Sequence, residues 1–343
     1  MIENKEIGMK KSVLLLSVIL ILWSSQIFGQ QEELHIQPVA GSLYVMTGAG
    51  CNVVFYVTEE GIVIADSGEK PDMAEKILEK IREVSDKPVR YLVFTHYHHA
   101  AGAADFPPPV VTISHKNTRD NITLRKKILL ELFTDTIKRL ELKAVQEKDK
   151  KGPELEKVKV ELELRKKQME TIQKEKVGLP QITFEKKIEI HLRVQPVVLL
   201  YLGPGHTNGD IIVHFPQEKV LYVGDLLFTN GWVPRLDGDA RASVNCWLNI
   251  FEKVAEMDVD RIISGHGEVV DKEEFIKVSK VFSEYLTDIK AEVKRYIERG
   301  ASLEEIKDEL RLLKYQHMGM AEILLPWNIE GVYRELKSHD IKE

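Results

Sequence analysis

Four short segments of this 343-residue chain carry the side chains best suited to chemistry, and each segment follows an apolar run. The segments are His96-Tyr97-His98, Gly205-His206-Thr207-Asn208-Gly209-Asp210, Gly224-Asp225 and Gly265-His266-Gly267. Imidazole is a common ligand of zinc, and a site with three protein ligands leaves a fourth position for water. Water bound to zinc ionises near neutral pH and becomes a nucleophile. The four segments therefore predict a catalytic metal centre.

Each segment taken alone also has a structural explanation. A buried histidine is usually satisfied by hydrogen bonds, and an aspartate after a strand is common in turns. Four such segments in one chain are harder to explain in this way. We therefore favour the metal site.

The apolar runs that precede these segments are typical of short β-strands. Residues 89–95, 197–202, 220–225 and 261–266 are rich in Val, Ile, Leu and Tyr, and residues 72–84 have helical periodicity. The order strand, helix, strand predicts an α/β layered fold. Ligands at strand ends sit on a rigid scaffold and leave an open face for a small-molecule substrate.

Residues 116–180 differ from the rest of the chain because they are dense in Lys, Glu, Leu and Arg. We expect an inserted helical hairpin with its turn at Gly152-Pro153, rather than a partner-binding arm, because mixed charge runs are usually solvated helix faces. Residues 273–343 are predicted to form a C-terminal helical extension that packs on the domain, with helix breaks at Gly300 and around Pro326.

The N-terminus predicts export. Lys10 and Lys11 precede a short apolar run that ends in small residues near Gly29. This pattern is typical of a secretory signal peptide, here residues 1–29, and the run is short for a membrane span. We expect a secreted or periplasmic protein with no stable membrane span after cleavage; an uncleaved anchor is the alternative.

Composition narrows the classes of partner. Hydrophobic residues make up 43% of the chain, which allows a sizeable core, and the net charge of −6 gives no basic patch for DNA or RNA. Cys51 and Cys246 are too few for a disulfide framework, so two ordinary core thiols are favoured over one bridge.

The order of the four segments resembles that of the metallo-β-lactamase superfamily, over a domain of residues 34–272 with the hairpin set aside. The resemblance implies a four-layer αβ/βα sandwich with the metal at one edge of two sheets. It implies that His96, His98 and His206 hold the first metal. It places Asp225 between two metals and His266 at the second, and these two residues are the candidate catalytic groups.

The resemblance also gives two buried carboxylates a supporting role. Asp66 closes the run Ile62-Val63-Ile64-Ala65 and looks like the family's structural aspartate before the first helix. Asp210 is expected to orient a ligand, a role that commonly tunes metal affinity.

The first motif departs from the family pattern His-x-His-x-Asp-His, because Ala100 and Ala101 stand where the last two residues are expected. A two-residue deletion in this loop explains the sequence equally well. The second metal then keeps only Asp225 and His266, so we expect one zinc and a weak or absent second ion. His99 or His115 could substitute, but we expect His99 to be a surface neighbour and His115 a strand-end residue.

The function predicted is that of a secreted metallo-hydrolase, in which a metal-bound hydroxide attacks a carbonyl of a β-lactam, lactone or thioester. One alternative is an oxidoreductase resembling persulfide dioxygenases, with a single iron at His96, His206 and Asp225. Another is a binding protein on a decayed site, which Ala100 and Ala101 motivate.

Overall fold

The computed structural model describes residues 33–69, 73–147, 153–174, 176–192 and 195–339. The predicted signal peptide lies outside these residues. Among the described residues, none of the helices combines the length and the apolar composition of a membrane span.

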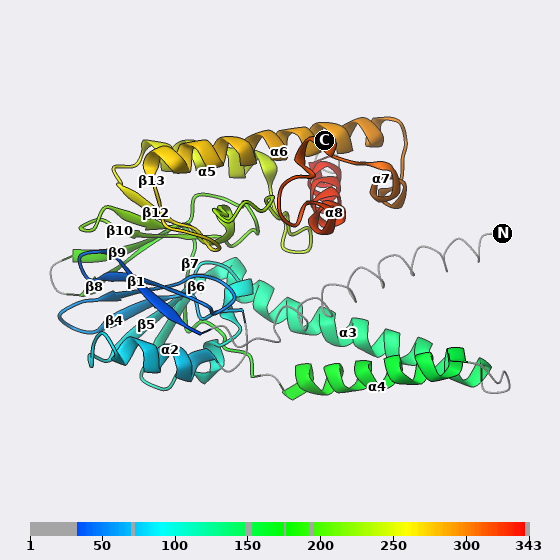
Figure 1. Ribbon diagram of the computed structural model, residues 1–343, viewed down its shortest axis with the longest axis horizontal. Coiled ribbons are helices and arrows are strands. Elements are labelled where there is room, and N and C mark those ends of the chain that lie inside the picture. The colour runs from blue at the N-terminus through cyan, green and yellow to red at the C-terminus, as the bar shows by residue number, and fades with distance from the viewer. Residues whose placement is uncertain (1–32, 70–72, 148–152, 175, 193–194, 340–343) are drawn as a thin grey trace.

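Two β-sheets form the centre of the molecule (Figure 1). The seven strands of the first sheet follow the chain order: β1 (His35–Ala40), β2 (Leu43–Thr47), β3 (Val53–Val57), β4 (Ile62–Ala65), β5 (Val89–Phe94), β6 (Val111–His115) and β7 (Ile182–Phe184). The second sheet has the order β13 (Val270–Asp271), β12 (Arg261–Ile263), β11 (Val220–Tyr222), β10 (Ile212–Phe215), β9 (Gln195–Leu200) and β8 (Lys187–Leu192).

Helices cover the outer face of each sheet (Figure 1). Helix α2 (Met73–Arg82) lies on the first sheet, and α5 (Val244–Glu256) and α6 (Lys272–Glu298) lie on the second. Side chains alternate between the two faces of a strand. In β4, Val63 joins the apolar cluster between the sheets, while Ile64 joins the cluster under α2. The predicted four-layer αβ/βα sandwich is confirmed.

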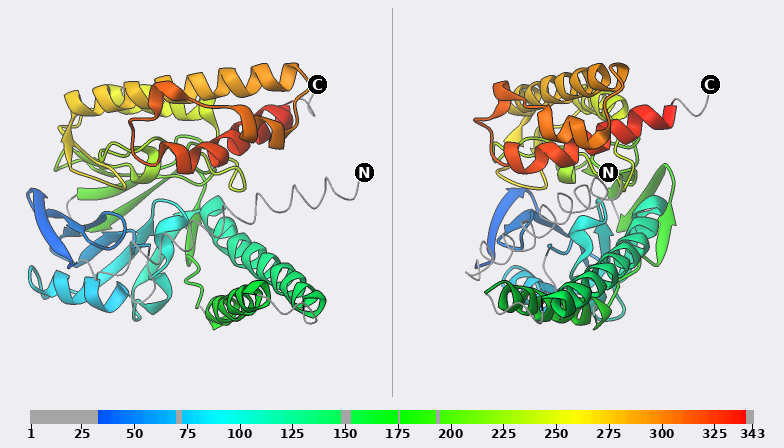
Figure 2. Two further views of the ribbon diagram at one scale, coloured as in Figure 1. Left: turned by 45° about the vertical axis from the view of Figure 1, so that its right-hand side comes forward. Right: turned by 90° about the vertical axis from the view of Figure 1, so that its right-hand side faces the viewer.

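Two long helices occupy the charged segment between β6 and β7. Helices α3 (Lys116–Gln146) and α4 (Pro153–Lys174) lie side by side and project from the edge of the first sheet (Figures 1 and 2). Ion pairs such as Lys143–Glu154 and Lys166–Glu141 join them at their solvent-facing side. The mixed charges therefore cover exposed helix faces.

The C-terminal segment packs on the second sheet through α6, α7 (Leu303–Glu309) and α8 (Ala321–His339). The predicted break at Gly300 is confirmed, and this residue takes a φ of 81° after α6. The predicted break around Pro326 is wrong, because α8 continues through it. A proline early in a helix removes one hydrogen bond, and buried residues further along, such as Ile329 and Val332, hold the helix in place. The remaining elements are the 3₁₀ turns η1 (His98–Ala100), η2 (Ala103–Asp105), η3 (Gly224–Leu226) and η4 (Leu313–Tyr315).

One buried amide fastens α8 to the loop after η3. Asn328 accepts a hydrogen bond from the backbone N–H of Leu236 at 2.7 Å and donates to the carbonyl of Pro234 at 2.8 Å. It also donates to the hydroxyl of Tyr285 on α6 at 2.8 Å. The C-terminal extension thus fixes the loop of residues 234–237.

Replacement of Asn328 by Ala is expected to lower the free energy of unfolding by about 2–4 kcal/mol, because buried backbone groups in the loop lose their partner. Denaturant unfolding measures this change. Ser338→Ala, at an exposed position of the same helix, is the control and should cost less than about 0.5 kcal/mol. Equal losses in the two variants would contradict the role of Asn328.

Candidate metal centre

The ligand-bearing segments meet at one edge of the two sheets. His96 follows β5, Asp225 lies in η3 after β11, and His266 follows β12. His98 begins η1, and His206 lies in the loop between β9 and β10. One ligand atom each from His96, His98, His206 and Asp225 lies within 4.8 Å of the others. We call these four residues the first cluster.

The spacing within the first cluster suits a single ion. Nδ1 of His98 is 2.9 Å from Nε2 of His206, and Oδ2 of Asp225 is 3.4 Å from Nε2 of His96 and 3.7 Å from Nε2 of His206. Four ligand atoms at zinc bond lengths of about 2.0–2.1 Å form a tetrahedron with edges of about 3.4 Å. The ligand atoms are therefore close enough together to surround one ion.

The far side of each imidazole ring has its own partner, which fixes the ring. Nδ1 of His206 donates to the carbonyl of Arg235 at 2.7 Å. Nδ1 of His96 lies 3.1 Å from Oγ1 of Thr95, which itself donates to Asp66. Nε2 of His98 lies 3.1 Å from the carboxylate of Asp237. The other ring nitrogens then face the centre. They are Nε2 of His96, Nδ1 of His98 and Nε2 of His206.

Burial keeps these three imidazoles neutral. It lowers the pKa of His96 and of His206, in the second case to about 3, and it lowers the pKa of His98 well below its usual value. A metal binds the deprotonated nitrogen, so no proton has to be displaced at neutral pH.

Asp225 lies between two groups of histidines. Its Oδ2 faces the first cluster, while its Oδ1 is 3.3 Å from Nε2 of His99 and 3.5 Å from Nε2 of His266. Burial alone would raise the pKa of Asp225, but the imidazoles of His99, His266 and His96 hold it well below its ordinary value. A Cβ at Gly265 would lie 2.0 Å from Oδ1 of Asp225, so this close approach requires glycine.

A second cluster adjoins the first, and it contains His266 together with Glu69 and His99. The prediction that His99 is a surface neighbour is wrong, because its side chain is completely buried. The 3₁₀ turn η1 buries both His98 and His99, and the carbonyl of His99 accepts hydrogen bonds from the N–H and hydroxyl of Ser67. His115 ends β6, as predicted, and its ring stacks on Tyr201.

Comparison with known proteins gives the family. A model of the metallo-beta-lactamase superfamily matches residues 46–266. The chain belongs to the metallo-β-lactamase superfamily. Among curated relatives, a linear primary-alkylsulfatase of a Pseudomonas species is 22% identical over 273 residues, which are 74% of this chain and 48% of the relative. A type 2 metallo-beta-lactamase of Elizabethkingia meningoseptica is 23% identical over 296 residues, 82% of this chain and 99% of the relative. The chain thus spans about half the length of the alkylsulfatase.

Solved structures share the fold. A stereoselective inverting sec-alkylsulfatase of a Pseudomonas species aligns with 88% of this chain and 50% of its own, with a TM-score of 0.59 and 15% identity. A metallo-beta-lactamase of Pontibacter korlensis aligns with 73% of this chain and 99% of its own, with a TM-score of 0.50 and 17% identity. These likenesses show the metallo-β-lactamase fold.

The two supporting carboxylates of this metallo-β-lactamase fold are both buried. Asp66 accepts hydrogen bonds from the N–H and hydroxyl of Thr95 and from the hydroxyl of Tyr222, and it lies 2.9 Å from Nδ1 of His99. Asp210 accepts from the N–H and hydroxyl of Thr207 and from the N–H of Gly205. Asp210 therefore holds the backbone on both sides of His206 without contacting the ring.

Sequence reasoning missed three residues at the centre: Glu69, Arg235 and Asp237. Each lies in an irregular loop with no apolar strand directly before it, so no pattern distinguished it from other surface charges. Asp237 is buried and accepts a hydrogen bond of 2.5 Å from the hydroxyl of Tyr97. Burial alone would raise the pKa of Asp237, but His98 and Arg235 hold it well below its ordinary value.

Both cysteines are free thiols in this structure, with Cys51 buried and Cys246 partly buried. Cys51 is buried beside the second cluster, and burial raises its pKa to about 12. The thiol therefore stays protonated at neutral pH.

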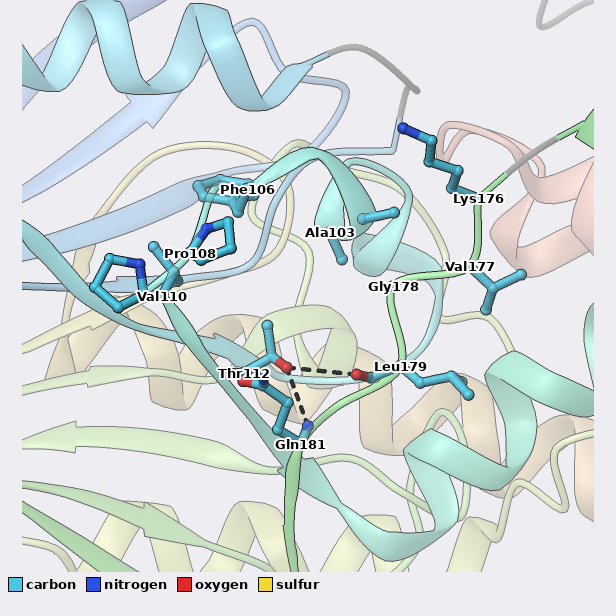
Figure 3. A pocket seen from close by; sticks show the side chains of 12 residues that line it. Ala103, Phe106, Pro108, Val110, Thr112, Lys176, Val177, Gly178, Leu179 and Gln181 are labelled. Carbon is cyan, nitrogen blue, oxygen red and sulfur yellow. Dashed lines mark hydrogen bonds between the residues drawn. The ribbon is translucent and has the colours of Figure 1, made fainter.

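A separate cavity of about 400 Å³ lies where the hairpin returns to the first sheet. Its lining includes Ala103, Phe106, Pro108 and Gly178, and Figure 3 shows Thr112 hydrogen-bonded to Leu179 and Gln181 at one side. None of the residues of the two clusters lines it. The cavity is thus distinct from the metal centre.

Asp237→Asn is expected to weaken zinc binding at the first cluster by about 10–100-fold, because the negative acceptor behind His98 is lost. Competition with a chromophoric chelator measures the affinity. Asp239→Asn, an exposed position in the same loop, is the matched control and should leave the affinity unchanged. An unaltered affinity in Asp237→Asn would contradict the orienting role.

The metal-free protein is expected to lose stability as the pH falls from about 6.5 towards 4. The unfolded chain protonates His96, His98 and His206 in this window, whereas the folded protein keeps them neutral. Each group then removes up to about 1.4 kcal/mol per pH unit. Two groups act in the opposite direction: Asp210, whose pKa burial raises to about 7, and His99, whose pKa Cys51, Asp225 and Asp66 raise against burial. The three neutral imidazoles outnumber them. Thermal unfolding in a chelator at pH 7 and 5 tests this; a higher melting temperature at pH 5 would refute it.

Proposed function

We propose that this protein is an exported metal-dependent hydrolase that cleaves an ester-like or lactam bond in a small anionic molecule. The observation that carries the proposal is the first cluster, where three neutral imidazole nitrogens converge beside one ionised carboxylate. Three imidazoles can hold an ion and leave a fourth position for water. The chain belongs to the metallo-β-lactamase superfamily, which supports hydrolysis because relatives there are named as lactamases and an alkylsulfatase.

The residues of the first cluster fit a divalent zinc ion, since Nε2 of the buried His96 has no hydrogen-bond partner among the described residues. When bound, such an ion polarises a substrate carbonyl and lowers the pKa of water. His96, His98 and His206 hold the ion, and their partners Thr95, Asp237 and Arg235 prevent the rings from turning. This arrangement preorganises the site before substrate arrives.

Asp225 supplies the carboxylate that orients the attacking water in our proposal. Its pKa is held low by the surrounding imidazoles, so it accepts a hydrogen bond rather than donating one at neutral pH. The family pattern places an additional aspartate where this chain has Ala100, so Asp225 carries this task without it.

Arg235 supports an anionic substrate. Its side chain is 29% exposed, its Nη2 lies 3.3 Å from Nε2 of His98, and its guanidinium stacks over Trp327 at 5.6 Å. A guanidinium binds a carboxylate or sulfate group through paired hydrogen bonds. A carboxylated lactam or lactone fits this arrangement, and Arg235 equally favours a sulfate ester as a second candidate substrate.

The export half of the proposal rests on the predicted signal peptide of residues 1–29. N-terminal sequencing of the protein recovered from the exported fraction tests it. A mature chain that begins shortly after Gly29 is expected, and an intact N-terminus in the cytoplasmic fraction would overturn it.

Metal analysis beside a substrate panel tests the hydrolase. The full mature protein is loaded with zinc or iron and assayed with a lactam, a lactone, a thioester and an alkyl sulfate. We expect zinc-dependent turnover of one of these classes, and loss of both metal and turnover in His206→Asn. An iron protein that consumes oxygen with a persulfide would favour the oxidoreductase instead, and metal content unchanged in His206→Asn would favour a binding protein.

Arg235→Gln is expected to raise KM for the anionic substrate by about tenfold or more, because a hydrogen bond to a charged group contributes about 1.5–3 kcal/mol. For a neutral ester of the same scaffold, KM should rise much less. The backbone carbonyl that holds His206 is unaffected by this change, so metal content should stay constant. Arg295→Gln on α6 is the control. An equal rise in KM for the charged and the neutral substrate would contradict the role of Arg235 in binding the anionic group.

A further inference from the structure

The second cluster brings Glu69 and a buried His99 beside Asp225 and His266, the two residues that the sequence pattern assigned to a second metal. We infer that Glu69, His99 and His266, together with Oδ1 of Asp225, form a second site for a divalent metal such as zinc. Glu69 and His99 would restore the donors that are missing at Ala100 and Ala101. The inference depends on the proposed function only through Asp225, which the two clusters share.

His99 is oriented as a metal ligand. Its Nδ1 lies 2.9 Å from Oδ2 of Asp66, so this nitrogen carries the proton and donates it to the carboxylate. The ring is completely buried, and its Nε2 has no hydrogen-bond partner among the described residues. A carboxylate behind a histidine is the usual arrangement around metal-bound imidazole. Burial of an unpartnered nitrogen is unfavourable unless another group, here a cation, satisfies it.

Asp225 has an unpartnered atom at the same place. Its Oδ1 is buried, lacks a hydrogen-bond partner in the described part of the chain, and lies 3.3 Å from Nε2 of His99. Since Oδ2 of the same carboxylate faces the first cluster, each oxygen serves one cluster. A carboxylate that bridges two ions in this way is consistent with a dinuclear centre.

Glu69 completes the set from the segment that follows β4. Its Oε1 is 3.8 Å from Nε2 of His266 and 3.9 Å from Nε2 of His99. Its backbone N–H donates to the carbonyl of Ala49 at 3.0 Å, which fixes the start of the side chain. A Cβ on Gly50 would lie 3.2 Å from Oε2 of Glu69, so glycine leaves room for the carboxylate.

The spacing and the chemistry of the donors agree. The distances of 3.3, 3.5, 3.8 and 3.9 Å between ligand atoms approach the edge of about 3.4 Å for a tetrahedral zinc site. Two imidazoles and two carboxylates suit zinc, iron, cobalt or manganese more than calcium or magnesium, which prefer oxygen alone. The side chain of Glu69 is 30% exposed and leaves a route for an ion from solvent.

Zinc titration of the metal-free full-length mature protein tests the inference. Bound zinc is counted by elemental analysis, and both affinities are measured by competition with a chromophoric chelator. We expect two ions per chain in the natural protein. Glu69→Gln should weaken only the second ion, by at least about tenfold, and His99→Asn should abolish it, while the first ion stays bound in both variants.

Three controls separate the possible outcomes. Glu60→Gln, at an exposed position, should keep both ions, and His206→Asn should weaken the first. Thermal unfolding identifies a variant that does not fold. If His99→Asn does not fold, the zinc count of Glu69→Gln tests the second site by itself, because this side chain is partly exposed and its replacement is compatible with folding. One tightly bound ion, lost in His206→Asn and unaffected by Glu69→Gln, would overturn the second site and leave the proposed function standing. Two ions that persist in Glu69→Gln and His99→Asn would overturn it as well. No bound zinc in the natural protein would overturn both.

Discussion

A buried negative charge, the carboxylate of Asp225, is the constraint on which the rest of the centre depends. A charge removed from water is unfavourable unless it is paired. Here the imidazoles of His96, His206, His99 and His266 surround it at 3.3–3.7 Å. Because burial keeps His96 and His206 neutral, these two imidazoles do not cancel the charge on Oδ2 of Asp225. The centre is thus shaped for positive charge.

The shell behind these ligands is carried by elements far apart in the chain. Thr95 and Asp66 follow strands of the first sheet, whereas Arg235 and Asp237 come from the loop between η3 and α5. The C-terminal extension fixes that loop through Asn328, so helices that touch no ligand determine where His98 and His206 point. Stability of the extension and geometry of the centre are coupled for this reason.

Several features were predictable from sequence because their signals are local. Continuous apolar runs such as that ending at Asp66 identified the strands, and the turn residues after them identified His96, His206 and Asp225 as neighbours of strand ends. The continuation of α8 through Pro326 was not predictable, since packing of Ile329 and Val332 against the core outweighs the local preference of proline. His99 was misjudged for a similar reason: the buried turn η1 places His98 and His99 in the interior, a property of φ and ψ that the residue order does not encode.

The sequence by itself determined the α/β layering, the family and the five candidate ligands, because strand periodicity and closely spaced motifs are written in neighbouring residues. Tertiary structure alone decided that Glu69, Arg235 and Asp237 join the centre. These residues stand in loops without periodicity, and their proximity to the ligands follows from how two sheets and three C-terminal helices pack together. Convergence of distant loops is a property of packing, and it emerges only when the whole core is formed.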